Sequence, residues 1–205
     1  HNPRNKKAAR TSKCKPNQLK LNPSQLNQCK CSNRKNQNNN KRSPTLTPQT
    51  QDNQKEVQPD DYRFKDEVGQ FKVKKIDSIK CQQYNIDNCK DSEYFIFDVT
   101  ANVYIDDTSN CKIYIAPCES TIFVRNCRNL VIITATKQFR TYECHNCVFS
   151  LLCKSQPVIE SSSELTFVPF EIHNYSQFEK QMNSIKLDPW NNHWSEIHNF
   201  TKKQG

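Results

Sequence analysis

The sequence predicts an all-β domain built as a solenoid, a parallel β-helix. Three observations lead to this prediction: residues 82–170 contain a repeat of about 18 residues, each repeat holds short alternating runs of β-branched and aromatic residues, and the chain has only two glycines. An antiparallel sandwich needs tight hairpin turns, and the sequence has no Asn-Gly or Asp-Gly pair to form them. Stacked rungs with corners of Asn, Asp, Cys, Ser and Lys are therefore favoured.

Five small residues anchor the repeat. They are spaced 17 to 19 residues apart: Cys89, Thr108, Cys127, Cys144 and Ser162. Mainly apolar side chains occur three and five residues before and after each anchor. In a stacked β-helix the anchors are expected to form an inward-facing ladder of small side chains. Because side chains alternate between the two faces of a strand, the columns three and five residues from the anchor share a face, which is expected to be the inward one. We therefore predict that the cysteines of the repeat are reduced thiols packed in the core.

Cys144 and Cys147 have the spacing of half a zinc site. Both, however, occupy repeat columns that hold Thr108 and Leu130 in other rungs, and the sequence offers no second ligand pair with matching spacing. We therefore expect no metal site.

The positive charge of the chain lies at its N-terminal end. Residues 1–60 hold 13 Lys and Arg against three acidic residues, whereas residues 61–205 hold 17 against 18. The first 60 residues contain no aromatic residue and too few apolar ones to form a core, so we expect a basic low-complexity arm that is disordered or extended. The folded domain is expected over residues 61–201, followed by a tail at 202–205.

The arm contains cysteines that are candidates for lipidation: Cys14, Cys29 and Cys31. Lipid chains together with Lys and Arg would bring the arm to a membrane surface, and the alternative is an untethered linker. No run approaches 18 apolar residues, so no transmembrane helix is expected. A nucleic-acid partner is not expected either, because the arm has no aromatic side chain on which bases stack.

An amphipathic helix is predicted from Tyr175 to Leu187, where apolar residues recur at helical spacing and Asp188-Pro189 closes the segment. Trp190 and Trp194 follow it. We expect both tryptophans to cover the open end of the solenoid, because an exposed strand edge invites aggregation.

The outward columns of the repeat bring together residues typical of a binding site. Gln138, Arg140 and Glu160 are expected on one exposed face of neighbouring rungs, surrounded by three aromatic residues: Tyr104, Phe123 and Tyr142. An arginine among aromatic side chains and amides is typical of a protein-binding hot spot. The alternative is that Arg140 merely pairs with Glu160 or another acidic residue on a solvated sheet.

At these residues the chain resembles the tubulin-binding cofactor C domain family. The resemblance runs in order from residue 61 to about residue 201 and includes Gln138-Phe139-Arg140 and the segments 81–83, 123–127, 156–162 and 194–200. It implies a right-handed parallel β-helix, which agrees with the repeat. It also implies GTPase activation, in which Arg140 acts as an arginine finger on the GTP of a partner.

The resemblance further assigns roles and partners. Gln138 would position the finger or the partner's switch region, and the remaining contacts with the GTPase would come from Glu160, Phe139, Tyr142, Phe123 and Tyr104. The partner would be an Arf-like small GTPase that carries GTP and Mg²⁺, so no cofactor of the chain itself is expected. Tubulin is a second possible partner.

A non-catalytic alternative remains at this point. The chain would then be a structural or adaptor protein of the cilium or axoneme that binds tubulin or a GTPase, and its basic arm would lie on acidic tubulin surfaces. Both interpretations imply the cytoplasm and cytoskeleton, with a cilium or basal body as the expected site of action.

Overall fold

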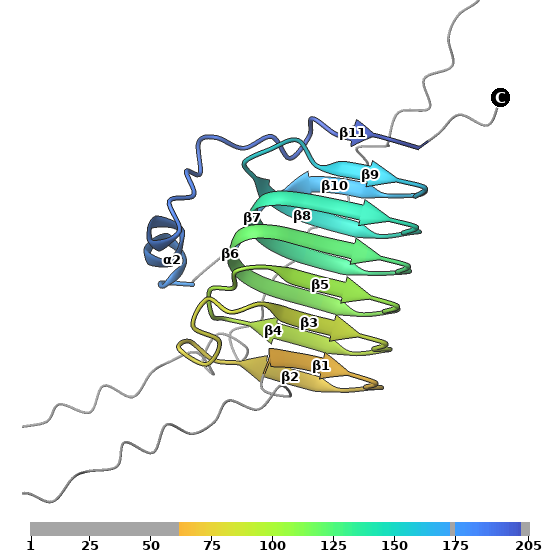
Figure 1. Ribbon diagram of the computed structural model, residues 1–205, viewed down its shortest axis with the longest axis horizontal. Helices are drawn as coiled ribbons and strands as arrows, with labels where there is room; N and C mark the ends of the chain where they lie inside the picture. Colours follow the sequence, from red (N-terminus) through yellow and green to blue (C-terminus); the bar gives the residue numbers. More distant parts are fainter. Residues whose placement is uncertain (1–61, 173–174, 202–205) are drawn as a thin grey trace, which may run out of the picture.

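The computed structural model describes residues 62–172 and 175–201, which form a parallel β-helix of about six turns (Figure 1). The predicted fold class is therefore confirmed. The expected arm, its cysteines and the expected tail lie outside the described residues. No helix in the described part of the chain is long and apolar enough to cross a membrane.

The strands lie in two parallel-paired layers, called sheet 1 and sheet 2 below. Sheet 1 contains β1 (Arg63–Lys65), β3 (Tyr84–Asp87), β5 (Val103–Asp106), the second halves of β6 (Lys112–Arg125) and β7 (Val131–Tyr142), β9 (Val158–Glu160) and β11 (His198–Asn199). Sheet 2 contains β2 (Phe71–Lys74), β4 (Glu93–Ile96), the first halves of β6 and β7, β8 (Val148–Cys153) and β10 (Thr166–Pro169). The long strands β6 and β7 thus belong to both sheets.

The strand register matches the columns predicted from the repeat. The column three residues before the anchors pairs rung by rung in sheet 1: Ile86, Ile105, Val124, Thr141 and Ile159. The column five residues after the anchors pairs in the same way in sheet 2: Tyr94, Ile113, Ile132, Phe149 and Phe167. All of these side chains are buried. Sequence spacing alone therefore predicted which residues of these two columns line the interior of the solenoid.

One rung precedes those that the repeat predicted. It consists of β1 and β2, and its position equivalent to the anchors is held by Glu67. A carboxylate is unlike the small residues of the other anchors, which explains why the repeat did not include this rung. Glu67 accepts a hydrogen bond from the Tyr94 hydroxyl (3.0 Å) and pairs with Lys72.

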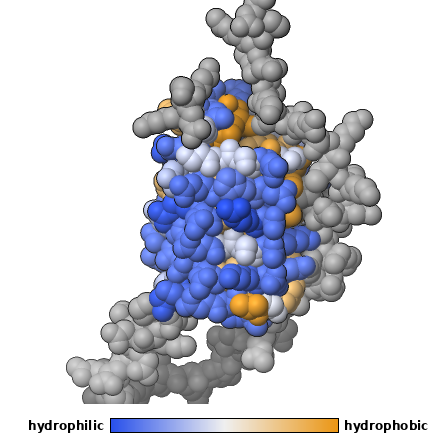
Figure 2. All heavy atoms as spheres, turned by 90° about the vertical axis from the view of Figure 1, so that its right-hand side faces the viewer, coloured by the Kyte–Doolittle hydropathy of each residue, from blue (hydrophilic) through white to orange (hydrophobic). Residues whose placement is uncertain are grey.

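The corners between the sheets turn without glycine in every rung but the first, where Gly69 takes one position. Each corner has two residues with positive φ, and most of them are Asn or Asp, which tolerate this conformation better than other side chains. Their amides also join successive corners: Asn110 donates to Asp91 (2.8 Å), Asn129 to Asn110 (2.8 Å) and Asn146 to Asn129 (2.7 Å). Figure 2 shows that this side of the molecule is mostly hydrophilic, with a hydrophobic patch near its lower end.

Replacing Asn129 tests this account of the corners. Asn129→Ala is expected to destabilise the fold by about 2 kcal/mol. Alanine adopts a φ of 56° less favourably than asparagine does, and the hydrogen bonds between successive corner amides are interrupted. Asn129→Gly removes the same hydrogen bonds, but glycine adopts a positive φ without strain, so this variant should lose less stability than Asn129→Ala. Urea unfolding of the two variants measures the difference, and equal losses would contradict a role for the backbone conformation.

A helix follows β10, but it is shorter than predicted. Helix α2 spans Phe178–Ser184, because Lys186 adopts a positive φ and Leu187 donates its backbone N–H to the carbonyl of Met182 (3.0 Å). This Schellman-type end stops the helix before Asp188-Pro189. The predicted apolar face is confirmed, since Phe178, Met182 and Ile185 pack in one cluster.

The helical segment covers the outer face of sheet 2. Phe95 and Tyr114 point away from the interior of the solenoid and cluster with Tyr175, and Leu152 clusters with Met182. Figure 1 shows α2 on one flank of the solenoid. Within the described residues no helix packs on sheet 1, so the outer face of that sheet is left for other contacts.

The two tryptophans differ from each other. Trp194 packs against the core cluster, as expected for a residue that covers the end of the solenoid. Trp190 is 93% exposed, so the expectation that it also covers this end is wrong. The turn that begins at Asp188 explains its position, because Asp188 accepts hydrogen bonds from the backbone N–H groups of Trp190 (2.9 Å) and Asn191 (3.2 Å).

The cysteines of the rungs are free thiols in the core, as predicted. Cys144 and Cys147 donate hydrogen bonds to backbone carbonyls, including those of Val124 (3.3 Å) and His145 (3.3 Å). Burial raises the pKa of Cys147 and of Cys153 to about 11, so both remain protonated at neutral pH.

These raised thiol pKa values predict a loss of stability in alkali. An unfolded cysteine ionises near pH 9, whereas Cys147 and Cys153 in the folded state ionise near 11. Stability should be unaffected by these thiols below pH 9 and should fall between pH 9 and 11, by up to about 1.4 kcal/mol per pH unit for each thiol. Urea unfolding at pH 8 and 10 measures this slope. Cys153→Ala should reduce it, and an unchanged slope in that variant would contradict the assignment.

Candidate functional site

The candidate site lies on the outer face of sheet 1 and centres on Arg140. Strand β7 presents this residue between Phe123 of β6 and Val158 of β9, its partners in the strand register. Arg140 is exposed, and its guanidinium carbon lies 5.9 Å from the centre of the Phe123 ring. Phe123 in turn stacks on Tyr104 of β5, with ring centres 5.5 Å apart and planes within 2°. Three consecutive strands therefore form one stack of flat side chains.

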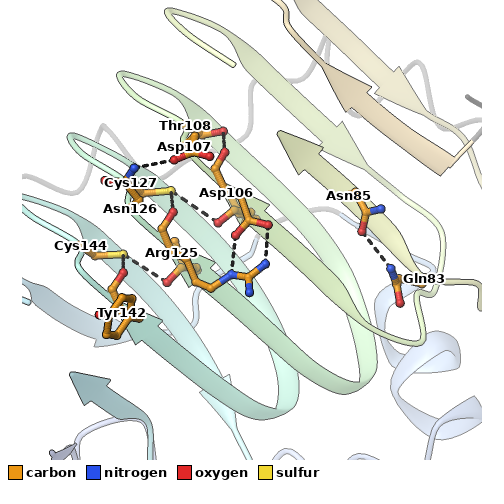
Figure 3. A network of polar contacts seen from close by, with 12 residues as sticks. Gln83, Asn85, Asp106, Asp107, Thr108, Arg125, Asn126, Cys127, Tyr142 and Cys144 are labelled. Carbon is orange, nitrogen blue, oxygen red and sulfur yellow. Dashed lines mark hydrogen bonds and ion pairs between the residues drawn. The ribbon is translucent and has the colours of Figure 1, made fainter. Parts of the chain in front are cut away.

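A second arginine on this face has a different environment. Arg125 donates two hydrogen bonds to the carboxylate of Asp106, from Nε (2.6 Å) and from a terminal nitrogen (2.7 Å), as Figure 3 shows. Asp106 raises the pKa of Arg125, and the guanidinium carbon of Arg125 lies 5.7 Å from the centre of the Tyr104 ring. The charge of Arg125 is thus balanced within the chain.

Arg140 has no such acidic partner. Among the described residues its side chain takes part in no hydrogen bond and no ion pair, and its guanidinium lies over the Phe123 ring. Glu160 lies beside Tyr142 in the strand register and forms no ion pair with Arg140. The alternative in which Arg140 merely pairs with Glu160 is therefore not observed.

A shallow hollow of about 450 Å³ adjoins Arg140. Its lining combines amides, an imidazole and apolar side chains: Gln138, Phe139, Arg140, Ser155, Gln156, Val158, His198 and Phe200. The Thr121 hydroxyl donates a hydrogen bond to the Gln138 side-chain carbonyl (3.3 Å). The predicted pair Gln138 and Arg140 thus lies at one depression of the surface.

The predicted docking residues are not equally accessible. Tyr142 is 43% exposed and Glu160 is exposed, whereas Tyr104 and Phe123 are half-buried in their stack. Phe139 is fully buried and packs on Phe149, with ring centres 4.9 Å apart. The expectation that Phe139 contacts a partner is therefore corrected: its side chain points into the solenoid, because it occupies an inward column of the repeat.

The structure adds two residues to the site that the sequence did not assign to it. His198 lies in β11, which pairs with β9 at the edge of sheet 1, and Phe200 directly follows β11. The centres of their two rings are 4.2 Å apart. Phe200 is 56% exposed. The segment 170–192 separates them from the repeat, so no spacing signal placed them beside Arg140.

The chemistry available beside the hollow is that of the Arg140 guanidinium, which has no acidic partner among the described residues. Among the described residues no group of three or more His, Cys, Asp and Glu side chains is arranged to hold a metal ion. A guanidinium is always charged and donates several hydrogen bonds from a planar group, which suits the recognition of phosphate or carboxylate oxygens. Arg140 is therefore able to reach an anionic group on another molecule.

Comparison with known proteins agrees with the resemblance noted in the sequence. Residues 81–200 match the family described as Tubulin binding cofactor C. The chain is 36% identical over 154 residues to Protein XRP2 of Xenopus laevis, covering 75% of this chain and 43% of that protein. It is 38% identical over 158 residues to Protein XRP2 of Homo sapiens, covering 75% and 44%.

A third relative matches a shorter part of the chain. Tubulin-specific chaperone C of Dictyostelium discoideum is 36% identical over 64 residues, which cover 31% of this chain and 15% of that protein. The chain spans less than half the length of the XRP2 proteins that it matches.

Proposed function

The chain belongs to the tubulin binding cofactor C family, and from this premise we propose that it activates an Arf-like small GTPase by supplying Arg140 as an arginine finger. The single observation that carries the proposal is the contrast between two arginines on sheet 1. Arg125 is neutralised by Asp106, whereas Arg140 is exposed and has no acidic partner among the described residues.

The proposed chemistry follows from the transition state of phosphoryl transfer. Negative charge is redistributed over the phosphate oxygens as the bond to the γ-phosphate breaks, and a guanidinium placed there stabilises that charge. The partner would supply GTP and Mg²⁺, so the chain needs no cofactor. Gln138 would help to place the finger, while Tyr142, Glu160 and Phe200 would contact the surface of the GTPase around it.

Recognition of the GTP-bound state tests this proposal. The full chain is immobilised and offered a panel of Arf-like GTPases, each loaded with GDP or with a non-hydrolysable GTP analogue. At least one GTPase should bind more tightly in the GTP-analogue form, because a finger needs a partner whose switch regions are ordered by the γ-phosphate. Binding that is absent for every GTPase, or equal in both states, would contradict the proposal.

A second candidate function is an adaptor on tubulin, placed in the cytoplasm at the cilium or basal body. It is favoured by the similarity to tubulin-specific chaperone C and by the positive charge of residues 1–60. Co-sedimentation with microtubules tests it, using the full chain, a variant that lacks residues 1–58 and Arg140→Ala. Salt-sensitive binding that is lost with the arm supports the adaptor, and binding that is independent of both arm and salt contradicts it.

A further inference from the structure

We infer that Tyr104 and Phe123 form an aromatic shelf that holds the Arg140 guanidinium in place on sheet 1, and that the Arg125–Asp106 ion pair braces the other end of this shelf. The effect of the shelf on catalysis rests on the proposed function. The shelf itself is a property of the free chain. It makes Phe123, Tyr104, Asp106 and Arg125 positioning residues rather than groups that touch the nucleotide.

The strand register creates the shelf. Tyr104, Phe123 and Arg140 are direct lateral partners on β5, β6 and β7, so their side chains leave the sheet side by side. The two rings are nearly parallel, and the Arg140 guanidinium lies over the free face of the Phe123 ring. A cation is attracted to the face of an aromatic ring, and a planar guanidinium stacks on it.

The far end of the shelf is fixed by a bidentate ion pair. Asp106 receives both hydrogen bonds from Arg125, as Figure 3 shows. The Arg125 guanidinium also lies over the Tyr104 ring. The two arginines therefore flank the same pair of rings. One is held by a carboxylate, while the other is held by a ring and keeps its hydrogen-bond donors unused by the described residues.

This arrangement solves a problem that an arginine finger faces. An exposed arginine side chain loses considerable rotamer entropy when it is fixed in one geometry. A carboxylate would fix it but would also occupy the donors that the phosphate needs, whereas an aromatic ring limits its motion and leaves every donor free. A shelf should therefore raise the maximal rate of hydrolysis more than it raises the affinity for the GTPase.

The decisive variants remove the ring of Phe123 or keep it. Phe123→Leu retains apolar bulk without a π face, and Phe123→Tyr retains the ring as the conservative control. With an Arf-like GTPase in single-turnover assays, Phe123→Leu should lower the rate at saturation about three- to thirtyfold. The half-saturating concentration should stay within about threefold, and Phe123→Tyr should retain the wild-type rate. Asp106→Asn should also lower the rate at saturation, but by a smaller factor than Phe123→Leu.

A double-mutant cycle tests whether the shelf acts through Arg140. In an Arg140→Lys background, which keeps part of the rate but lacks the planar group that stacks on the ring, Phe123→Leu should cause a much smaller loss of rate than in the wild type. Additive losses, or a loss confined to the half-saturating concentration, would overturn the inference and make Phe123 a simple contact residue. If Arg140→Ala itself changes no rate with any GTPase, the proposed function is wrong.

A measurement without any GTPase decides the shelf independently. NMR relaxation of the arginine Nε–Hε groups in the free chain should show Arg140 to be less mobile than Arg128, an exposed arginine at a corner. Phe123→Leu should raise the mobility of Arg140 to that of Arg128, and Phe123→Tyr should not. If Arg140 is as mobile as Arg128 in the wild type, or if Phe123→Leu does not change it, the shelf does not exist.

Discussion

Arg140→Ala is expected to lower the stimulated rate of GTP hydrolysis by about 10³- to 10⁵-fold, close to the rate of the GTPase alone. The reason is that alanine removes an exposed cation on sheet 1 that lacks an acidic partner among the described residues. Single-turnover hydrolysis with saturating chain measures the effect. Binding to the GTP-analogue form should change far less than the rate, because the finger acts on charge that develops in the transition state.

Two further variants sharpen this test. Arg140→Lys keeps the charge but loses the planar, multidentate donor, so it should recover only part of the rate. Arg128→Ala is the matched control, since Arg128 is an exposed arginine at a corner rather than on the outer face of sheet 1. A rate that survives Arg140→Ala, or that falls equally in Arg128→Ala, would mean that Arg140 is not the finger.

Phe139→Ala is expected to destabilise the solenoid by about 3–5 kcal/mol, although Phe139 stands between two predicted site residues in the sequence. Its ring is fully buried and packs on Phe149, which packs on Phe167 of the next rung (ring centres 5.3 Å apart). Alanine would leave a cavity that a continuous stack of rungs fills poorly. Urea unfolding followed by circular dichroism measures the loss.

Phe200→Ala is the matched control for Phe139→Ala. Both phenylalanines line the hollow beside Arg140, but Phe200 is 56% exposed, so its removal should change stability by no more than about 0.5 kcal/mol. Phe200→Ala should instead weaken the binding of a GTPase. A Phe139→Ala variant with wild-type stability and weakened binding would restore the docking role that the structure argues against.

Much of the fold could be predicted from the sequence, because each rung of a solenoid repeats the same spacing of inward and outward residues. The spacing of Cys89, Thr108, Cys127, Cys144 and Ser162 fixes the register of every rung that it includes, and with it the outward position of Arg140. The rung anchored by Glu67 was not recognised in the sequence, because a partly buried carboxylate replaces the small residue of the other anchors. Helix α2 was predicted too long. Its C-terminal end is set by the positive φ of Lys186, and a lysine in the sequence does not indicate that conformation.

The site was less accessible because it depends on contacts that have no period. The repeat predicted that Arg140 faces outward, but not that Phe123 supports its guanidinium or that Asp106 neutralises the neighbouring Arg125. Nor did it predict that β11 brings His198 and Phe200 to the same hollow, because a long covering segment interrupts the spacing. These differences decide which arginine is available to a partner.

Binding of a transition-state analogue tests most directly whether Arg140 serves catalysis. An Arf-like GTPase loaded with GDP and aluminium fluoride presents a planar group in place of the transferred phosphoryl. The wild-type chain should bind this form at least about 100-fold more tightly than the GDP form, and Arg140→Ala should lose most of that preference while Arg128→Ala keeps it. An Arg140→Ala variant that retains the full preference would show that the charge of the transition state is stabilised elsewhere.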